Sequence, residues 1–405
     1  MKILILADGR SPITLNWLRS LKSLNHQIVL VSSYPCEQPQ EADEFFILPV
    51  AFSGLSGSSI PKNKAKDGSK SEGSDRTFIR RFRPLLINFR YILGPFSLPL
   101  TARKFNRIVS QTNPDLIHAL RIPYEGMLLS FYRGNIPCAV SIWGNDITLH
   151  AQGSAMMRQL TQKTLKKVRG LAADTKRDIR LGKNWGFPTD EPALVVPGNG
   201  GIDFTKVRIT AEKEQVGLNW LPENWNIVIN PRGFRPGSVR NDTFFQSIPL
   251  ILRQFPNTLF LCCSMAGQPE ADAWLDELQI HRNTMLLPTI PQELLWSLFS
   301  RAQVTVSISE HDGTPNSLLE AMTCGCFPVA GDIESIREWI TPGVNGLLVD
   351  PNNPEQLASA VISALLNEKL RSDAAEINRQ IILERADSEI ARTEIEVFYN
   401  QCVSD

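Results

Sequence analysis

The stretch from Ser309 to Gly325 constrains the fold most, because it encodes a loop and a short helix with both ends specified. Thr314 is suited to cap the helix, since its hydroxyl can accept a hydrogen bond from a free N–H of the first turn. Pro315 fits the first helical position, where its missing N–H costs nothing. Gly325 can end the helix in a left-handed conformation. The sequence therefore predicts a helix that begins just after Gly313.

The start of this predicted helix is suited to bind an anion. The N–H groups of the first turn and the positive end of the helix dipole favour a phosphate, and Gly313 places no side chain in front of them. Two carboxylates flank the start, with Asp312 just before it and Glu320 inside the helix. Taken alone, the stretch fits an ordinary capped helix behind a buried strand equally well.

Strand-like and helix-like patterns alternate through both halves of the chain, which is typical of parallel α/β sheets. In the first half, apolar runs predict strands at 3–6, 28–31, 115–118, 138–143, 171–174 and 193–197. In the second half, strands are predicted at 225–230, 258–263 and 304–309, and helices at 242–254, 292–301 and 354–367. The polar segment 372–399 is predicted to be largely helical. No glycine-rich dinucleotide fingerprint follows the first strand, which argues against an NAD-type site.

A glycine-rich break at 198–201 divides the chain. We expect a Rossmann-like domain at 1–202, with a mobile Gly/Ser/Lys-rich loop at 53–76, and a second Rossmann-like domain at 203–375. The polar helical segment 376–405 is expected to return to the first domain. In such doubly wound sheets, ligands bind at the carboxyl ends of the strands.

Charge is unevenly distributed, although the chain is neutral overall. Residues 1–200 hold 27 Lys and Arg against 15 Asp and Glu, a net of +12, and the remainder carries a net of −12. This asymmetry predicts an anionic partner for the first half, or two domains that attract each other. The seven cysteines show no zinc or disulfide spacing, and no apolar run is long enough for a signal peptide or a membrane span. We expect a cytoplasmic protein, and no nucleic-acid partner.

Residues 76–107 combine basic residues with aromatic ones and contain no acid. Such a segment can lie on an anionic lipid surface, so we expect peripheral contact with the inner face of a membrane. A helix whose aromatic side chains face the core and whose arginines are solvated fits the same pattern.

Asp312 and Glu320 stand eight positions apart and are followed by Ala-Met-x-Cys-Gly-x-x-Pro-Val. This pattern resembles the Glu-x7-Glu signature of family-4 retaining glycosyltransferases, with Asp in place of the first Glu. The similarity continues through Glu338 and residues 343–349, and it is strongest over residues 225–365. The resemblance implies the GT-B fold, in which two doubly wound Rossmann-like domains face each other across a cleft.

The resemblance also implies a UDP-sugar donor bound by the second domain. Glu320 would hold the ribose hydroxyls, since an ionised carboxylate makes strong hydrogen bonds to them. Asp312 would contact the donor sugar. Groups near the helix start would share in binding the donor: Gly313, Thr314, Asn316, Ser317 and Leu318.

The loop after the first strand of the second domain carries an arginine, Arg232, that matches the family's pyrophosphate-binding Arg, but it lacks the family's Lys. Arg240 is our choice for the second cation, with Arg235 as the alternative. Thr289 falls in the base-recognition loop, and Gly201 resembles a residue that approaches the diphosphate. Because no convincing Asp-x-Asp pair is present, we expect no metal and no cofactor. Arginines and the helix dipole would then stabilise the leaving diphosphate.

In the first domain, residues 143–146 resemble the family's His-Gly-x-Asp segment, with Trp in place of His. Asp146 would meet the donor sugar or the acceptor hydroxyl, and with Asp312 and Arg232 it makes up the predicted catalytic set. His118 is near in sequence, but an isolated histidine is more often structural.

The sequence thus predicts a retaining, metal-independent hexosyltransferase. It would move a sugar from a UDP-sugar to a hydroxyl of a glycan or lipid-linked saccharide, a precursor of cell-envelope or exopolysaccharide material. Two alternatives stay open. One is a scaffold protein that binds a nucleotide sugar without turnover, favoured by the Asp at 312 and the Trp at 143. The other is a UDP-sugar epimerase, for which no convincing acid–base set is visible.

Overall fold

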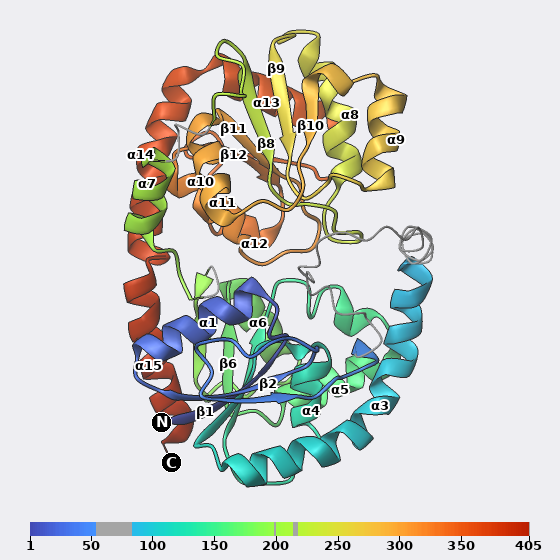
Figure 1. Ribbon diagram of the computed structural model, residues 1–405, viewed down its shortest axis with the longest axis vertical. Coiled ribbons are helices and arrows are strands. Elements are labelled where there is room, and N and C mark those ends of the chain that lie inside the picture. The colour runs from blue at the N-terminus through green and yellow to red at the C-terminus, as the bar shows by residue number, and fades with distance from the viewer. Residues whose placement is uncertain (54–82, 198–199, 214–217, 405) are drawn as a thin grey trace, which may run out of the picture. The chain divides into compact units, whose positions relative to one another are not determined.

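The computed structural model describes residues 1–53, 83–197, 200–213 and 218–404, without the side chains of 83–89, 212 and 213. The chain forms two compact units, Met1–Val195 with Glu394–Asp405, and Val196–Thr393 (Figure 1). The domain boundaries expected at 202/203 and 375/376 therefore lie at 195/196 and 393/394. The expected mobile loop at 53–76 lies outside the described residues except for Ser53.

The first unit is built on a parallel seven-stranded sheet with strand order β3-β2-β1-β4-β5-β6-β7. Its strands are β1 (Lys2–Ala7), β2 (Gln27–Ser32), β3 (Glu44–Ile47), β4 (Leu116–Ala119), β5 (Cys138–Ile142), β6 (Gly170–Ala173) and β7 (Ala193–Val195). Five consecutive residues are buried in β1 and again in β2, as expected of central parallel strands covered on both faces. The edge strand β3 is only partly buried, so it lacks the apolar run by which the others were predicted.

Helices and short turns connect these strands. They are α1 (Pro12–Ser23), α3 (Arg83–Thr112), η2 (Ile122–Gly126), α4 (Met127–Leu129), η3 (His150–Gln152), α5 (Ala155–Leu165) and α6 (Lys176–Asn184). Helices α5 and α6 start at side-chain caps, because the hydroxyls of Ser154 and Thr175 accept from amides of the first turn. Each cap of this kind stabilises a helix by about 1 kcal/mol.

The end of the chain packs into the first unit. Helix α15 (Ser388–Val403) starts in the second unit and ends in the first. The indole Nε1 of Trp17 donates to the hydroxyl of Tyr399 at 2.8 Å, and both side chains are almost fully buried. Because a buried polar group without a partner is costly, this bond ties the last turns of α15 to α1.

The second unit is built on a parallel six-stranded sheet with strand order β10-β9-β8-β11-β12-β13. The strands are β8 (Asn226–Asn230), β9 (Thr258–Cys262), β10 (Thr284–Leu286), β11 (Val304–Ser307), β12 (Phe327–Gly331) and β13 (Leu347–Val349). The helices and one short turn of this unit are α7 (Phe204–Lys213), α8 (Asn241–Leu252), α9 (Pro269–Leu278), η6 (His281–Asn283), α10 (Gln292–Arg301), α11 (Asn316–Thr323), α12 (Glu334–Arg337), α13 (Pro354–Leu366) and α14 (Glu368–Arg385).

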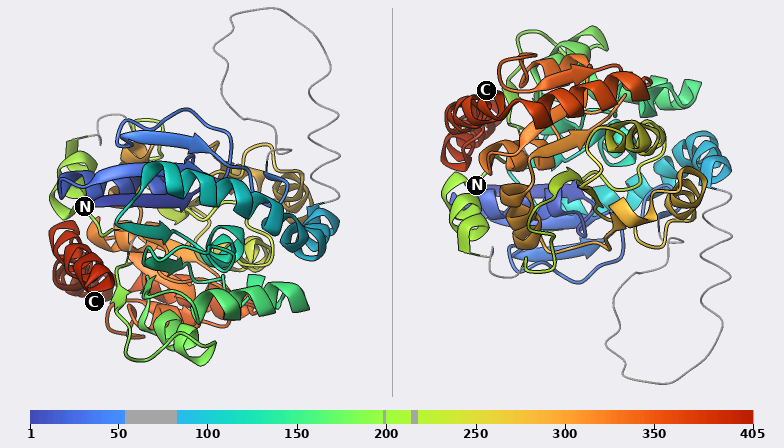
Figure 2. Two further views of the ribbon diagram at one scale, coloured as in Figure 1. Left: turned by 90° about the horizontal axis from the view of Figure 1, so that it is seen from below. Right: turned by 90° about the horizontal axis from the view of Figure 1, so that it is seen from above.

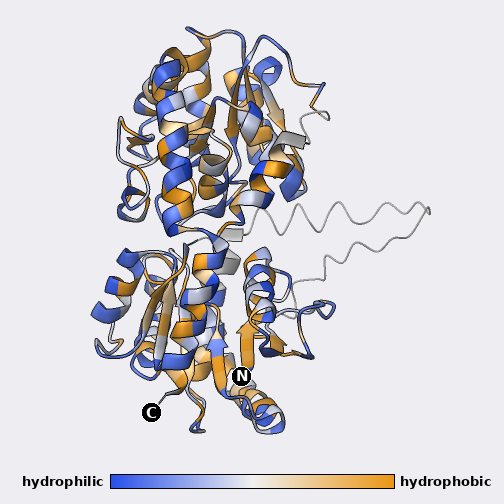
Figure 3. Ribbon diagram, turned by 90° about the vertical axis from the view of Figure 1, so that its left-hand side faces the viewer, coloured by the Kyte–Doolittle hydropathy of each residue, from blue (hydrophilic) through white to orange (hydrophobic). Residues whose placement is uncertain are grey.

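Two hydrophobic cores cover the two faces of this second sheet. Ile227 and Ile229 of β8 pack into one core, and Val228 between them packs into the other. The three middle positions of the strand are therefore apolar, because successive side chains point to opposite faces and both faces are buried. Helices lie on both sides of the sheet (Figure 2). Figure 3 shows these helices banded with hydrophilic and hydrophobic residues, as expected where one side of a helix is packed and the other solvated.

Residues 372–399, predicted to be largely helical, form parts of two helices. Helix α14 ends at Arg385 and α15 begins at Ser388. Between them, the carbonyl of Ala386 accepts from the amide of Ile202 at 2.7 Å, and the amide of Ser388 donates back to Ile202 at 3.0 Å. This pairing draws the backbone out of the helix.

Candidate functional site

A loop pair marks the point where the strand order of the second sheet reverses. Strands β8 and β11 are neighbours, and the sheet grows from them in opposite directions. Open α/β sheets bind ligands at the carboxyl ends of the strands at such a switch point. In this unit the loops that leave those ends are residues 231–240 and 308–315.

These two loops are fixed to each other by backbone hydrogen bonds. Val239 and Ser309 form an antiparallel bridge. The amide of Arg240 donates to the carbonyl of Ile308, and the amide of Glu310 donates to the carbonyl of Ser238, both at 2.9 Å. The side chains that follow β8 and β11 are therefore held in a defined geometry.

An ion pair between Arg232 and Asp312 lies at the centre of the loop pair. Arg232 is 7% exposed, and its Nη2 contacts Oδ2 of Asp312. The same carboxylate accepts from the hydroxyl of Ser309 at 3.0 Å and from the amide of Gly313 at 3.1 Å. The Nε of Arg232 is buried without a hydrogen-bond partner among the described residues. Asp312 thus orients an arginine that has donors left for a ligand.

The other two arginines of the loop differ in their surroundings. Arg240 is bound by the carboxylates of Asp242, at 2.7 and 2.9 Å, and of Glu310, at 3.1 Å. Arg235 is solvent-exposed, and the like charge of Arg232 lowers the pKa of Arg235 to about 10. The charge of Arg235 therefore lies close to that of Arg232, whereas Arg240, our first choice for the second cation from the sequence, has acidic partners.

The helix after this loop begins later than its sequence predicts. Helix α11 starts at Asn316, and Pro315 is the capping residue without a side-chain cap. Thr314 does not cap the helix, because its hydroxyl accepts from the indole Nε1 of Trp339 at 2.9 Å. Within the described residues, the amides of Asn316 and Ser317 donate no hydrogen bond, and Oδ1 of Asn316 is buried without a partner. The two amides at the start of α11 are therefore suited to an anion, whereas Oδ1 of Asn316 is an acceptor that requires a donor.

The end of the same helix is as predicted. Gly325 has a φ of +80°, in the left-handed region. Its amide donates to the carbonyl of Met322 at 3.2 Å, and the amide of Cys326 donates to Ala321 at 2.9 Å. This is a Schellman motif, which satisfies two of the last carbonyls of the helix.

Glu320 is a buried carboxyl group one turn into the same helix. It is 5% exposed and accepts a hydrogen bond from Nε2 of Gln292, at the start of α10. Burial raises the pKa of Glu320 to about 7, although the bond from Gln292 opposes the shift. Leu318, also predicted to lie at the site, is 1% exposed and packs in the core, which leaves only its backbone for a ligand.

Two further predicted contacts lie at the edges of the second unit. Thr289 is exposed on the loop that follows β10. Gly201 has a φ of +88°, and a Cβ atom there would lie 2.7 Å from Cα of Ser388 and 2.9 Å from the carbonyl oxygen of Ala386. Close packing against the chain between α14 and α15 explains this glycine without a ligand.

Asp146 of the first unit is held by protein groups rather than presented to solvent. It is 0% exposed, and its carboxylate accepts from Nη2 of Arg121 and the amide of Ile122, both at 3.1 Å, and from the amide of Trp143 at 3.3 Å. These bonds fix the loops after β4 and β5. Asp146 therefore orients Arg121, and its predicted contact with a sugar stays a prediction.

His118 is structural, as an isolated histidine was expected to be. Its Nδ1 lies 2.7 Å from the hydroxyl of Tyr399, which accepts a hydrogen bond from Nε1 of Trp17, and its Nε2 lies 2.9 Å from the hydroxyl of Ser141. Burial lowers the pKa of His118 to about 3, so the ring is neutral.

Sequence reasoning missed several partners of these groups. Gln292, Ser309 and Trp339 each bond a predicted site residue, and Arg121 pairs with Asp146. Only Arg121 carried a usable signal, since it follows the carboxyl end of a predicted strand. In the described part of the chain, no group of three or more His, Cys, Asp or Glu residues is placed to hold a metal ion.

Comparison with known families matches both halves of the chain. Residues 239–381 match the family described as "Glycosyl transferases group 1", and residues 59–175 match "Glycosyl transferase 4-like". Curated relatives match over short segments. A glycosyltransferase of Methanocaldococcus jannaschii is 36% identical over 72 residues, which is only 18% of this chain and 18% of that relative.

Solved structures align along nearly the whole chain. Sucrose-phosphate synthase from Thermosynechococcus elongatus aligns with a TM-score of 0.73 at 14% identity and covers 99% of both chains. HepE from Anabaena, in complex with UDP, aligns with a TM-score of 0.70 at 14% identity, over 99% of this chain and 100% of that chain. The predicted fold class, GT-B with two Rossmann-like units, is confirmed by this likeness and by the two parallel sheets.

Proposed function

Because each half of this chain carries a glycosyltransferase domain, we propose that the protein transfers a sugar from a UDP-sugar to a hydroxyl of a glycan or lipid-linked saccharide. The observation that carries the proposal is the buried Arg232 at the switch point, next to the open start of α11. The UDP complex of the structurally similar HepE supports the choice of donor.

The leaving diphosphate is the group that most needs stabilisation. Arg232 and Arg235 supply two positive charges, and the amides of Asn316 and Ser317 with the dipole of α11 supply neutral donors. All of them are in place before the bond breaks, so they cost little reorganisation when the charge develops. Removing one such donor typically raises the barrier by about 3–4 kcal/mol. The proposal therefore needs no metal ion.

Glu320 and Asp312 have distinct roles in this proposal. Glu320, ionised, accepts hydrogen bonds from the two ribose hydroxyls of UDP, and binding of UDP lowers its raised pKa. Asp312 acts through Arg232, which it orients, and through the donor sugar if the pair opens. Thr289 lies on the loop proposed to meet the uracil base.

We propose that the reaction retains the anomeric configuration by attack on the face from which UDP leaves. The bond from the anomeric carbon to the diphosphate oxygen breaks, and a bond to the acceptor oxygen forms on the same face. The proton of the acceptor hydroxyl passes to the departing phosphate oxygen. Neither Asp312 nor Glu320 is free to act as a nucleophile, since the first is paired with Arg232 and the second is buried.

Release of UDP tests the proposal directly. Candidate UDP-sugars are incubated with saccharide acceptors in the presence of EDTA, and UDP and the product are quantified. The proposal predicts UDP release that depends on the acceptor, and NMR of the product should show the anomeric configuration of the donor. Activity that disappears in EDTA would refute the metal-free step, and an inverted product would refute same-face attack.

A non-catalytic scaffold is the second candidate, favoured by the engagement of both Asp312 oxygens with protein groups. A scaffold binds UDP-sugar but releases no UDP with any acceptor. The same assay, run beside calorimetric binding of UDP, separates the two functions.

We also propose that the acceptor is a cell-envelope or exopolysaccharide precursor, met by a cytoplasmic protein at the inner face of a membrane. On α3, Ile92, Phe96 and Leu100 are 57%, 62% and 67% exposed and stand four residues apart, on one side of the helix. Arg103 and Lys104 follow on the next turn and are exposed, and the sequence of α3 contains no acid. An apolar stripe next to cations fits an anionic lipid surface. Among the described residues, no helix is long and apolar enough to span a membrane.

A further inference from the structure

The first unit places arginines at the switch point of its own sheet. Strands β1 and β4 are neighbours, with β2 and β3 on one side and β5 to β7 on the other. Arg10 follows the carboxyl end of β1, and Arg121 follows that of β4. The geometry that predicts a ligand site in the second unit is therefore present in the first unit as well.

Two arginines lie over one aromatic ring at this position, and a third follows the neighbouring strand. The guanidinium carbon of Arg10 lies 4.0 Å from the ring centre of Tyr34, and that of Arg90 lies 6.0 Å from the same ring and 4.6 Å from the ring of Tyr124. Arg121 lies on the loop after β4, three residues before Tyr124, whose ring Arg90 covers. We call Arg10, Arg90 and Arg121 the arginine cluster.

The acidic partners of the arginine cluster lie mostly behind it. Asp146, which binds Arg121, is 0% exposed, and Glu125 is 3% exposed. The side chains of Arg10 and Arg121 are 33% and 39% exposed. The guanidinium groups are therefore exposed to solvent, and buried carboxylates hold them in place. Asp8 is the exception, since it is partly exposed and binds Arg10 through both of its oxygens at 3.0 Å.

Donors remain available on all three arginines within the described residues. Asp8 uses Nε and Nη2 of Arg10, which leaves Nη1. Arg90 donates through Nε to the carbonyl of Ala51, which leaves both Nη groups. Arg121 donates through Nη2 to Asp146, and its Nε is buried without a partner. An arginine carries five N–H donors, so an incoming anion finds several of them unused.

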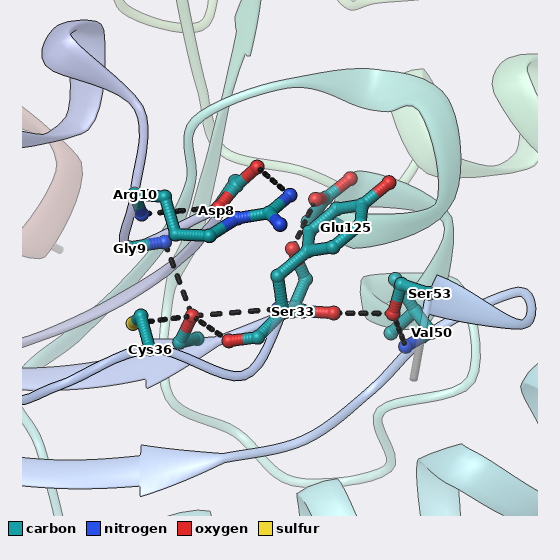
Figure 4. A network of polar contacts seen from close by, with 10 residues as sticks. Asp8, Gly9, Arg10, Ser33, Cys36, Val50, Ser53 and Glu125 are labelled. Atoms are coloured by element: carbon teal, nitrogen blue, oxygen red, sulfur yellow. Dashed lines mark hydrogen bonds and ion pairs between the residues drawn. The ribbon is translucent and has the colours of Figure 1, made fainter. Parts of the chain in front are cut away.

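Buried polar contacts lock the loops that carry the arginine cluster. Figure 4 shows Arg10 paired with Asp8 and, nearby, Ser33 bonded to Glu125. The hydroxyl of Ser33 donates to Glu125 at 2.6 Å, and the hydroxyl of Ser53 donates to the carbonyl of Ser33 at 2.5 Å. These bonds join the loops after β2, β3 and β4. Rigid support of this kind is what a binding site requires.

The turn before Arg10 is fixed by close packing. A Cβ atom on Gly9 would lie 2.7 Å from Sγ of Cys36 and 3.0 Å from Oγ of Ser32, and the amide of Gly9 donates to that same Ser32 oxygen at 3.1 Å. Only a residue without a side chain brings the backbone this close. The position of Arg10 is therefore set by the loop after β2.

We propose that the arginine cluster binds a phosphate or diphosphate group of the acceptor, so that the acceptor of this enzyme is a phosphorylated saccharide. The proposal rests on the transferase function and adds the chemical class of its acceptor. Planar guanidinium groups match phosphate oxygens in pairs, and three of them offer more donors than a carboxylate can accept. The source of the phosphate is a free sugar phosphate or the diphosphate that links a saccharide to a lipid.

Calorimetry on the full chain saturated with UDP tests this proposal. The probes are inorganic pyrophosphate, glucose 6-phosphate and farnesyl diphosphate in detergent, with glucose as the neutral control, all at constant ionic strength. We expect at least one phosphate probe to bind ten-fold or more tightly than glucose. Preference for glucose 6-phosphate indicates a free sugar phosphate, and preference for farnesyl diphosphate indicates a lipid-linked one.

Substitutions assign the binding to the arginine cluster. We expect the affinity for the phosphate probe to fall ten-fold or more, and the affinity for UDP to stay unchanged, in each of the variants Arg10→Gln, Arg90→Gln and Arg121→Gln. Arg133→Gln, an exposed arginine of the same unit, is the matched control and should change neither. Arg121→Gln removes the partner of a buried carboxylate, so Arg10→Gln and Arg90→Gln decide the result if that variant does not fold.

Two results would overturn the proposal. One is a wild-type protein that binds UDP but binds no phosphate probe better than glucose. The other is unchanged affinity for phosphate in the Arg10 and Arg90 variants. A wild-type protein that fails to bind UDP refutes the transferase function instead, so the two failures are distinguishable.

Discussion

Replacing Glu320 by Gln should stabilise the protein and impair nucleotide binding, with both effects dependent on pH. The carboxyl is 5% exposed, and burial raises its pKa from the ordinary 4.5 to about 7. At about 1.36 kcal/mol per unit, this shift corresponds to about 3 kcal/mol of unfavourable free energy for the ionised form in the folded protein. Gln keeps the shape of the side chain and never ionises.

The sign of the pH dependence follows from the direction of the pKa shift. Between pH 4.5 and about 7 the folded protein keeps a proton on Glu320 that the unfolded chain has lost. The free energy of unfolding of the wild type therefore falls as pH rises through this interval. We expect Glu320→Gln to match the wild type near pH 4.5 and to exceed it by about 3 kcal/mol at pH 8.5.

Binding of UDP should change in the opposite direction. Two ribose hydroxyls lose an ionised acceptor in the variant, which costs about 2–3 kcal/mol, or roughly 30- to 150-fold in affinity. The affinity of the wild type should rise with pH through about pH 7, and that of the variant should not. UDP binding near pH 7 should also release a proton from the wild type only.

Urea denaturation at both pH values and calorimetry in two buffers of different ionisation enthalpy measure these effects. Glu277→Gln, on the exposed side of α9, is the control and should show neither. A stability gain that is equal at both pH values would refute the assignment of the gain to ionisation. Undiminished UDP binding by Glu320→Gln would refute the ribose contact.

Three further substitutions test the remaining parts of the site. Arg232→Gln should lower kcat about 10²- to 10³-fold with little change in KM, since the charge of Arg232 meets the diphosphate as the bond breaks. Steady-state kinetics in which KM rises as much as kcat falls would contradict that role. Arg235→Gln should lower kcat more than Arg240→Gln, because Arg240 is bound by two carboxylates. The reverse order would make Arg240 the second cation at the diphosphate. Phe96→Ser should reduce co-sedimentation with anionic vesicles several-fold, whereas Leu366→Ser, at 64% exposure in the second unit, should not; equal effects would remove α3 as the lipid contact.

Most strands and the fold class were predictable because both faces of each sheet are buried, although the buried strand β12 was not predicted. The middle of β8 and the whole of β11 are then built from apolar or small residues, and a run of such residues is visible without any knowledge of the fold. Strands β3, β10 and β13 are short and partly exposed, so their sequences carry no comparable signal.

The ends of α11 show where local sequence suffices and where it does not. Gly325 ends the helix as predicted, because a left-handed residue is a local requirement. Thr314 was predicted to cap the start, but its hydroxyl is bonded to Trp339, which is distant in sequence. A cap depends on which other donors reach the hydroxyl, and only the folded chain determines that.

Charged residues were hardest to assign for the same reason. Arg232 and Asp312 were each placed at the site by the resemblance to family-4 glycosyltransferases, but nothing in the sequence indicated that they pair. Arg240 was preferred over Arg235 by spacing alone, and its bonds to Asp242 and Glu310 become visible only when the two loops meet. Asp146 matched a motif, yet it is fully buried behind Arg121.

A crystal structure of the protein with UDP tests the central claim most directly. The account predicts diphosphate oxygens within about 3 Å of the Arg232 guanidinium and of the amides of Asn316 and Ser317, with no metal ion between them. A diphosphate bound away from the start of α11, or held there through a metal ion, would contradict it.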